Sequence, residues 1–131
     1  MMSDFERIIY RILLRENKKF KQEKVITDLR NGLYRFDFYL PTEKIAIEVQ
    51  GPQHYEYNKF FHKKRSEFTK AQERDRQKIS YCLAHGIKLY CIPYWEVEGI
   101  YRYKDIIQDK FLAKSKFHND FVWKNRNVEK S

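Results

Sequence analysis

The first apolar residues of the chain recur at the spacing of an amphipathic helix. They lie three or four positions apart on one helical face: Phe5, Ile8, Ile9, Ile12 and Leu13. Ser3 followed by Glu6 has the spacing of a capping box, in which each residue satisfies a backbone N–H group of the other. The pattern therefore predicts a first helix that ends near Glu16.

The next part of the chain has the pattern of three successive strands. Residues 20–29 are strand-like, Arg30-Asn31-Gly32 has the composition of a turn, and residues 33–40 alternate between apolar and polar side chains. After a break at Pro41, residues 45–50 predict a third strand. We therefore expect three antiparallel strands in a row.

The second half returns to helical spacing. Residues 63–85 predict a long helix, and Gly86 is a typical residue just past a helix end. A fourth strand is expected at residues 87–92 and a further helix at residues 96–114. The remaining residues, 114–131, are basic and weakly patterned, so they are either a docked tail or an arm for nucleic acid.

Composition indicates one folded domain. The chain has 131 residues, of which 42% are hydrophobic and 17% aromatic, which excludes general disorder. No apolar run is long enough to span a bilayer, and the first residues lack the order of a signal peptide, so we expect a soluble intracellular protein. Cys82 and Cys91 lie in apolar stretches, which favours buried thiols over a disulfide or a zinc site.

The net charge of the chain indicates what kind of partner it binds. Lys and Arg number 27 against 18 Asp and Glu, a formal net charge of +9. Such an excess favours a polyanion, with nucleic acid first, whereas the basic segments lack the apolar stripe of a membrane-surface helix. A solvated surface tuned for solubility is the alternative. The candidate nucleic-acid contacts are the basic residues before and within the predicted long helix: Lys59, Lys63, Lys64, Arg65, Lys70 and Arg74.

Two acidic residues interrupt the apolar pattern of the second and third predicted strands. Alternation places Phe36 and Phe38 on one face and turns Asp37 away from them, while Glu48 lies in the middle of the next strand. If the strands pair as a hairpin, Asp37 and Glu48 project close together. Two such carboxylates need a cation, and Mg²⁺ suits oxygen ligands of this kind. The alternative is a pair of strand acids that face solvent.

The residues around these acids resemble a known family. Residues 35–41 (RFDFYLP) and 45–55 (IAIEVQGPQHY) are similar to the metal-binding hairpin of PD-(D/E)xK, restriction-endonuclease-like nucleases. Residues 74–78 (RDRQK), 81–82 (YC) and 86–94 (GIKLYCIPY) resemble the continuation in phage-type and very-short-patch-repair-like members, including the homing-endonuclease branch. The resemblance covers roughly residues 3–112.

The resemblance implies an αβββαβ core, of α/β (α+β) class, with a mixed central sheet flanked by helices. It implies a nuclease core domain at residues 1–113 and a basic tail at residues 114–131. By position, Asp37 and Glu48 are the expected metal ligands, with the Val49 backbone carbonyl as a third. The expected cofactor is Mg²⁺, with Mn²⁺ able to substitute.

Gln50 departs from the commoner family residue, a lysine that helps to activate water and to stabilise negative charge on phosphorus. An amide can position water but supplies no charge. Lys78 is a candidate replacement cation. It follows Asp75 by one helical turn, so the two residues either point at the site together or form a surface ion pair.

His54 is the best candidate for a general base, because its ordinary pKa lies near neutrality and it stands just beyond the metal strand. A hydrogen-bonded structural histidine is the alternative. Glu6 resembles the first-helix acid of the family, although its capping role already explains it. Gln53 and Tyr55 are candidates to line the site.

These observations lead to one main hypothesis and two alternatives. The main hypothesis is an enzyme, a metal-dependent DNA endonuclease of phage or mobile-element origin that acts on DNA alone or as a homodimer. One alternative is a nucleic-acid-binding module with a decayed site. The other is a nuclease specific for junctions or RNA. No sequence-reading motif stands out, so the sequence predicts no target site.

Overall fold

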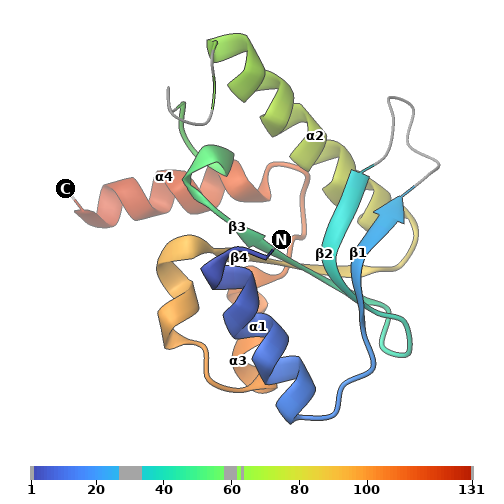
Figure 1. Cartoon of the computed structure of the whole chain (residues 1–131). Helices are drawn as coiled ribbons and strands as arrows, with labels where there is room; N and C mark the ends of the chain where they lie inside the picture. Colours follow the sequence, from blue (N-terminus) through green and yellow to red (C-terminus); the bar gives the residue numbers. More distant parts are fainter. Residues whose placement is uncertain (1, 27–33, 58–61, 63, 131) are drawn as a thin grey trace.

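The structure is a computed structural model that describes residues 2–26, 34–57, 62 and 64–130. Its centre is a four-stranded sheet in the order β1 (Lys21–Ile26), β2 (Tyr34–Leu40), β3 (Ile45–Gln50) and β4 (Lys88–Pro93). The first three strands are antiparallel, as predicted, and β4 is parallel to β3 (Figure 1). The fold is thus mixed α/β with a mixed sheet. The turn predicted at residues 30–32 lies outside the described residues.

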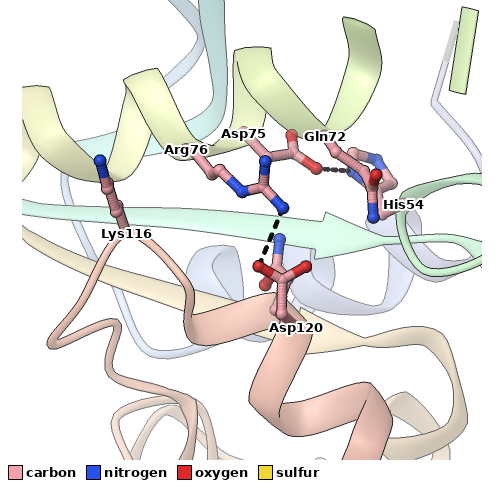
Figure 2. A pocket seen from close by; sticks show the side chains of 7 residues that line it. His54, Gln72, Asp75, Arg76, Lys116 and Asp120 are labelled. Atoms are coloured by element: carbon pink, nitrogen blue, oxygen red, sulfur yellow. Dashed lines mark hydrogen bonds and ion pairs between the residues drawn. The ribbon is translucent and has the colours of Figure 1, made fainter. Parts of the chain in front are cut away.

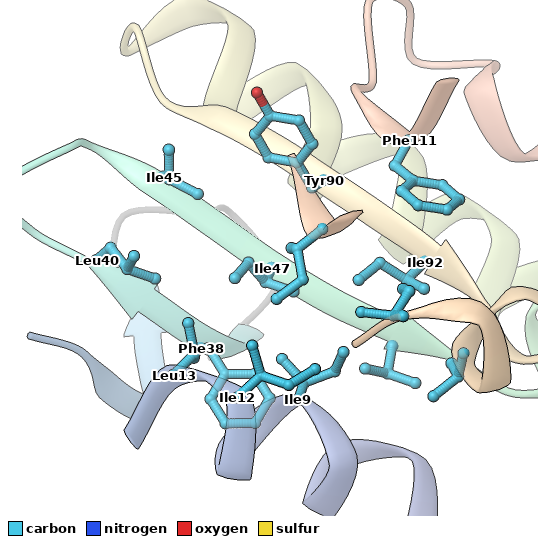
Figure 3. Packing of buried hydrophobic residues seen from close by; sticks show 14 residues of the cluster. Ile9, Ile12, Leu13, Phe38, Leu40, Ile45, Ile47, Tyr90, Ile92 and Phe111 are labelled. Atoms are coloured by element: carbon cyan, nitrogen blue, oxygen red, sulfur yellow. The ribbon is translucent and has the colours of Figure 1, made fainter. Parts of the chain in front are cut away.

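Helix α1 (Asp4–Arg15) covers one face of the sheet. The Ser3 side chain caps it by accepting the Glu6 N–H at 3.1 Å, as the capping-box spacing predicts. Figure 3 shows side chains of α1 against the strands. The α1-side core takes residues from β2, β3 and β4 and includes Ile9, Ile12, Leu13, Phe38, Ile45, Ile47, Val49, Tyr90 and Ile92.

Helix α2 (Arg65–Ala84) packs on the other face. The α2-side core consists of Phe36, Ala46, Ile79, Cys82, Leu89, Cys91 and Ala113. The two cysteines are free, buried thiols, as predicted. Gly86 lies just past the helix with a φ of +68°, a conformation that glycine adopts without the steric cost a Cβ would bring.

The expectation that Phe36 and Phe38 share a face is wrong. Phe36 packs in the α2-side core and Phe38 in the α1-side core. The strand alternation is interrupted at Asp37, between them. Glu23, in the facing part of β1, has a φ of +51°, which marks a local irregularity there. The interruption lets both phenylalanine rings become buried.

The prediction of a single helix at residues 96–114 is also wrong. In its place stand η2 (Tyr94–Gly99), α3 (Tyr103–Ile106) and η3 (Asp109–Phe111). Ile100 is extended, and Asp105 accepts the backbone N–H groups of Tyr101 and Arg102 at 3.0 Å each, so α3 starts anew. These short elements still bury most of the apolar side chains of the predicted helix, although Ile107 is exposed.

Helix α4 (His118–Lys130) forms in the segment that carried little pattern. Its Trp123 ring stacks on Tyr55 at a centroid distance of 5.8 Å, and its Asp120 pairs with Arg76 of α2 at 3.1 Å. Of the two readings of residues 114–131, a docked segment fits these contacts. Across the described ranges, no helix is long and apolar enough to cross a membrane.

Candidate functional site

The two predicted acids lie where β2 and β3 stop pairing regularly. The register between these strands runs from Leu40–Ile45 to Phe38–Ile47. Asp37 and Glu48 are the next residues in each strand. At this point Oδ2 of Asp37 accepts the backbone N–H of Val49 at 2.8 Å. The Asp37 side chain, and not a backbone carbonyl of β2, therefore accepts the Val49 N–H. This hydrogen bond holds Asp37 beside Glu48.

The surroundings of Asp37 disfavour its negative charge. Burial raises the pKa of Asp37 most, the charge of Glu48 raises it further, and Glu6 of α1 adds a smaller effect in the same direction. The Val49 N–H and the Lys78 charge act the other way, and the resulting pKa of Asp37 is about 7. A cation at this position would offset the repulsion. The first-helix acid thus lies within electrostatic reach of Asp37.

Lys78 contacts the second acid directly. Its Nζ lies 2.7 Å from Oε1 of Glu48, and both side chains are largely buried. Burial disfavours the Lys78 ammonium, but the charge and hydrogen bond of Glu48 outweigh burial and raise the pKa of Lys78. Of the two readings of Lys78, the one that turns it toward the site fits this contact, since Lys78 pairs with Glu48.

His54 and Asp75 form a second pair. The turn η1 (Pro52–His54) carries the ring to α2, where Nδ1 lies 2.8 Å from Oδ2 of Asp75. Because a carboxylate only accepts, Nδ1 carries the hydrogen and Nε2 is left with a free lone pair. Burial disfavours the imidazolium, but the Asp75 hydrogen bond and charge outweigh it, so the pKa of His54 is raised.

Gln50, the residue that departs from the family pattern, is almost fully buried. Its Oε1 accepts a hydrogen bond from the Tyr55 hydroxyl at 2.7 Å. The Tyr55 ring in turn lies against Trp95 at 5.0 Å and Trp123 at 5.8 Å. The orientation of the Gln50 amide therefore depends on an aromatic cluster that includes α4.

The oxygen atoms available for a metal come from two carboxylates. Asp37 and Glu48 are close enough to interact electrostatically. Within the described part of the chain, no group of three or more His, Cys, Asp or Glu side chains is placed to hold a metal ion. Mg²⁺ is commonly held by one or two carboxylates with water completing its shell, so this donor set fits that ion.

Four of the six candidate nucleic-acid contacts lie on α2 or directly before it. Lys64, Arg65, Lys70 and Arg74 are exposed at the start and along the outer face of α2. Lys59 and Lys63 lie outside the described residues. The exposed row follows the helix that carries Asp75 and Lys78 on its inner face.

Three further residues border His54 and were missed by the sequence. Figure 2 shows Arg76 of α2 and Asp120 of α4 across a small pocket whose lining includes His54 and Asn119. Arg76 Nη2 donates to Asp120 at 3.1 Å. The only sequence signal was the set of aromatic residues in the basic terminal segment, which carried no periodicity.

Comparisons with known proteins found viral relatives. The chain is 38% identical over 96 residues to uncharacterized protein 094L of Frog virus 3 (isolate Goorha), which is 71% of this chain and 62% of that protein. It is 34% identical over 71 residues to uncharacterized protein 307L of Invertebrate iridescent virus 6. It is 36% identical over 58 residues to uncharacterized protein 033L of Invertebrate iridescent virus 3.

These matches cover only part of the relatives. The chain spans 62%, 36% and 30% of their respective lengths. No family model matches the chain, and no solved structure does. The chain is therefore similar to three viral proteins over part of their length.

Proposed function

We propose that this chain is a metal-dependent DNA endonuclease with a restriction-endonuclease-like core. The observation that carries the proposal is the meeting of Asp37 and Glu48 beside Lys78, with His54 and Asp75 next to them. The element order and the mixed sheet agree with that core. An intracellular site of action and viral or mobile-element origin belong to the same proposal.

The proposed cofactor is Mg²⁺, with Mn²⁺ as a substitute. Asp37 and Glu48 would hold the ion, with the Val49 carbonyl as a third oxygen. When bound, such an ion lowers the pKa of water and offsets charge on phosphate oxygens. The raised pKa of Asp37 supports this role, because the carboxylate pair has more negative charge than its surroundings stabilise.

The residues around the acids have complementary roles in this proposal. His54 Nε2 accepts the proton of the attacking water, while Asp75 holds the ring by Nδ1. Lys78 supplies the positive charge that the usual family lysine provides, and Gln50 positions water through its amide nitrogen.

The proposal also says how the DNA is bound and how many of its strands are cut. The exposed basic residues of α2, from Lys64 to Arg74, contact the DNA backbone. One such site cuts one strand, so a double-strand cut requires a homodimer or two successive events.

One observation favours the alternative of a decayed binding module. Lys78 pairs with Glu48 at 2.7 Å, so the second acid already has a partner without a metal ion. Such a module binds DNA in a salt-dependent way and leaves it uncut. A nuclease specific for junctions or RNA shares the same site and differs only in substrate.

The test is cleavage of supercoiled plasmid by the purified chain in Mg²⁺ or Mn²⁺, beside EDTA. Asp37→Asn and Glu48→Gln remove charge with little change in shape, and Asp109→Asn, in an exposed pair with Lys114, is the matched control. Nicking that stops with EDTA and with both site variants, but not with the control, supports the proposal. If plasmid, branched DNA and RNA all stay intact while DNA binds, the binding module replaces it.

A further inference from the structure

The pocket beside His54 contains buried polar atoms that have no partner in the described part of the chain. Asn119 of α4 is only 8% exposed, yet neither its Oδ1 nor its Nδ2 makes a hydrogen bond. Arg76 Nε, from α2, is also buried and unpaired. Both residues line the same pocket. Figure 2 shows the Arg76 side chain directed at Asp120, with His54 to the right of both.

Unpaired buried groups of this kind are costly to the fold. A buried donor or acceptor without a partner loses its hydration, at about 1–3 kcal/mol, and native structures contain few of them. Leucine is close to asparagine in shape and would avoid the cost at position 119. The amide of Asn119 is therefore better explained by something that enters the pocket than by packing.

The unpaired groups of the lining favour an anion, although its charged side chains include both signs. The carboxylates of Asp75 and Asp120 are already paired with His54 and Arg76. Lys116 adds a positive charge, and its Nζ lies 5.1 Å from the centre of the Phe117 ring. The groups left to bind a ligand are mainly donors, namely Asn119 Nδ2, Arg76 Nε and Lys116 Nζ.

The size of the pocket limits what can enter. Its interior holds about one water-sized group, so a nucleobase does not fit, whereas an oxygen atom of a phosphate does. Phosphate oxygens accept hydrogen bonds from amide, guanidinium and ammonium groups, and are the commonest contacts of proteins on nucleic acid.

We propose that Asn119, Arg76 and Lys116 form a subsite for a phosphate group of the bound nucleic-acid strand, next to the phosphodiester that faces His54. The proposal rests on the proposed nuclease function. His54 borders both the subsite and the carboxylate pair, so a phosphate held here fixes which neighbouring bond is presented. Helix α4 is then part of the substrate-binding surface.

The first test measures phosphate binding alone. Inorganic phosphate is titrated into the ¹⁵N-labelled full chain, and the backbone amide signals of residues 116–120 are followed in every variant, with the Asn119 side-chain amide as a further signal in the wild type. Asn119→Leu and Lys116→Gln are expected to weaken phosphate binding about tenfold or more, because the first removes a hydrogen-bond donor and the second removes a positive charge. Asn125→Leu, at an exposed position of the same helix, is the control.

Thermal unfolding in phosphate-free buffer separates a ligand site from a structural amide. Asn119→Leu is expected to keep or raise Tm, because it removes a buried unpaired group. A lower Tm for Asn119→Leu together with unchanged phosphate affinity overturns the subsite, since Asn119 is then held by internal water. A phosphate response that is the same in Asn119→Leu as in the wild type also overturns it.

Cleavage assays then test the subsite separately from the nuclease proposal. They also test whether the subsite binds a DNA strand as well as free phosphate. For a short DNA substrate, Asn119→Leu is expected to raise KM about tenfold with a smaller effect on kcat. Cleavage by the wild type with an unchanged KM in Asn119→Leu overturns the subsite and keeps the nuclease. Phosphate binding that depends on Asn119, in a chain that binds but never cuts nucleic acid, overturns the nuclease and keeps the subsite.

Discussion

The Lys78 ammonium lies 2.7 Å from Oε1 of Glu48, although the two residues are thirty positions apart. The contact joins the inner face of α2 to Glu48 of β3, beside which Asp37 of β2 lies. Because Lys78 and Glu48 are 16% and 5% exposed, water screens their attraction little. The pair therefore holds a charge of each sign at the place where the proposed reaction occurs.

Removing the Lys78 ammonium leaves the Glu48 carboxylate buried without its partner. We expect Lys78→Met to lower the free energy of unfolding by about 3–5 kcal/mol, measured by urea denaturation. Lys114→Met breaks an exposed pair with Asp109 and should cost less than about 1 kcal/mol. Adding Glu48→Gln to Lys78→Met should recover much of the loss, and a double variant no more stable than Lys78→Met would contradict this account.

The Asp75 carboxylate stabilises the charged form of His54. A raised histidine pKa contributes stability that is present below the ordinary value of 6.5 and is lost as the pH rises through the folded value. Asp75→Asn should therefore lower the pKa of His54, followed by NMR of the imidazole, and destabilise the fold more at pH 6 than at pH 9. Asp109→Asn should leave the His54 titration unchanged.

The Tyr55 hydroxyl is the donor to Gln50 Oε1. Tyr55→Phe keeps the ring contacts with Trp95 and Trp123 but leaves this buried oxygen unpaired. We expect a loss of about 1–3 kcal/mol in the free energy of unfolding. Tyr101→Phe, at a side chain that is 69% exposed, should change it little. Equal stability of the two variants would show that Gln50 does not depend on the hydroxyl.

Asp37 links stability to pH and to metal. Its pKa is 3.8 in the unfolded chain and about 7 in the fold, so the folded state binds the Asp37 proton more tightly. The stability that this proton contributes is fully present below pH 3.8 and is lost as the pH rises through 7. The contribution of Asp37 to the free energy of unfolding should fall over this window, so the wild type should lose stability relative to Asp37→Asn as the pH rises.

Metal binding tests the same carboxylate above that window. If the pair binds Mg²⁺, the ion should raise Tm at pH 8 in the wild type and much less in Asp37→Asn. Asp109→Asn should respond to Mg²⁺ as the wild type does. An equal rise in Tm for all three proteins would place the bound ion elsewhere on the chain.

Helix α4 is held by the Trp123 ring. Trp123→Ala removes contacts with Tyr55 and Trp95 from a half-buried side chain, so we expect a loss of about 1–3 kcal/mol. Phe121→Ala, on the same helix and 58% exposed, is the matched control and should have little effect. Hydrogen exchange across residues 118–126 would locate the loss in α4.

Local sequence patterns were sufficient for several of the regular elements. The residues of α1, the strand β3, and the glycine that ends α2 all follow from spacing. The interpretation failed at residues 96–114, where apolar side chains at helical spacing enter the core from short turns. Spacing does not distinguish a buried helix face from a series of turns, because both place apolar residues at similar intervals.

The sequence by itself determined the mixed α/β class, the order of the strands along the chain and the positions of Asp37 and Glu48 in adjacent strands. Only the tertiary structure decided that Lys78 turns to Glu48, that His54 meets Asp75, and that α4 docks beside them. The physical reason is the distance along the chain over which each kind of information acts. Backbone periodicity is a local property, whereas these contacts join residues 21 to 44 positions apart and depend on how α2 and α4 pack against the sheet.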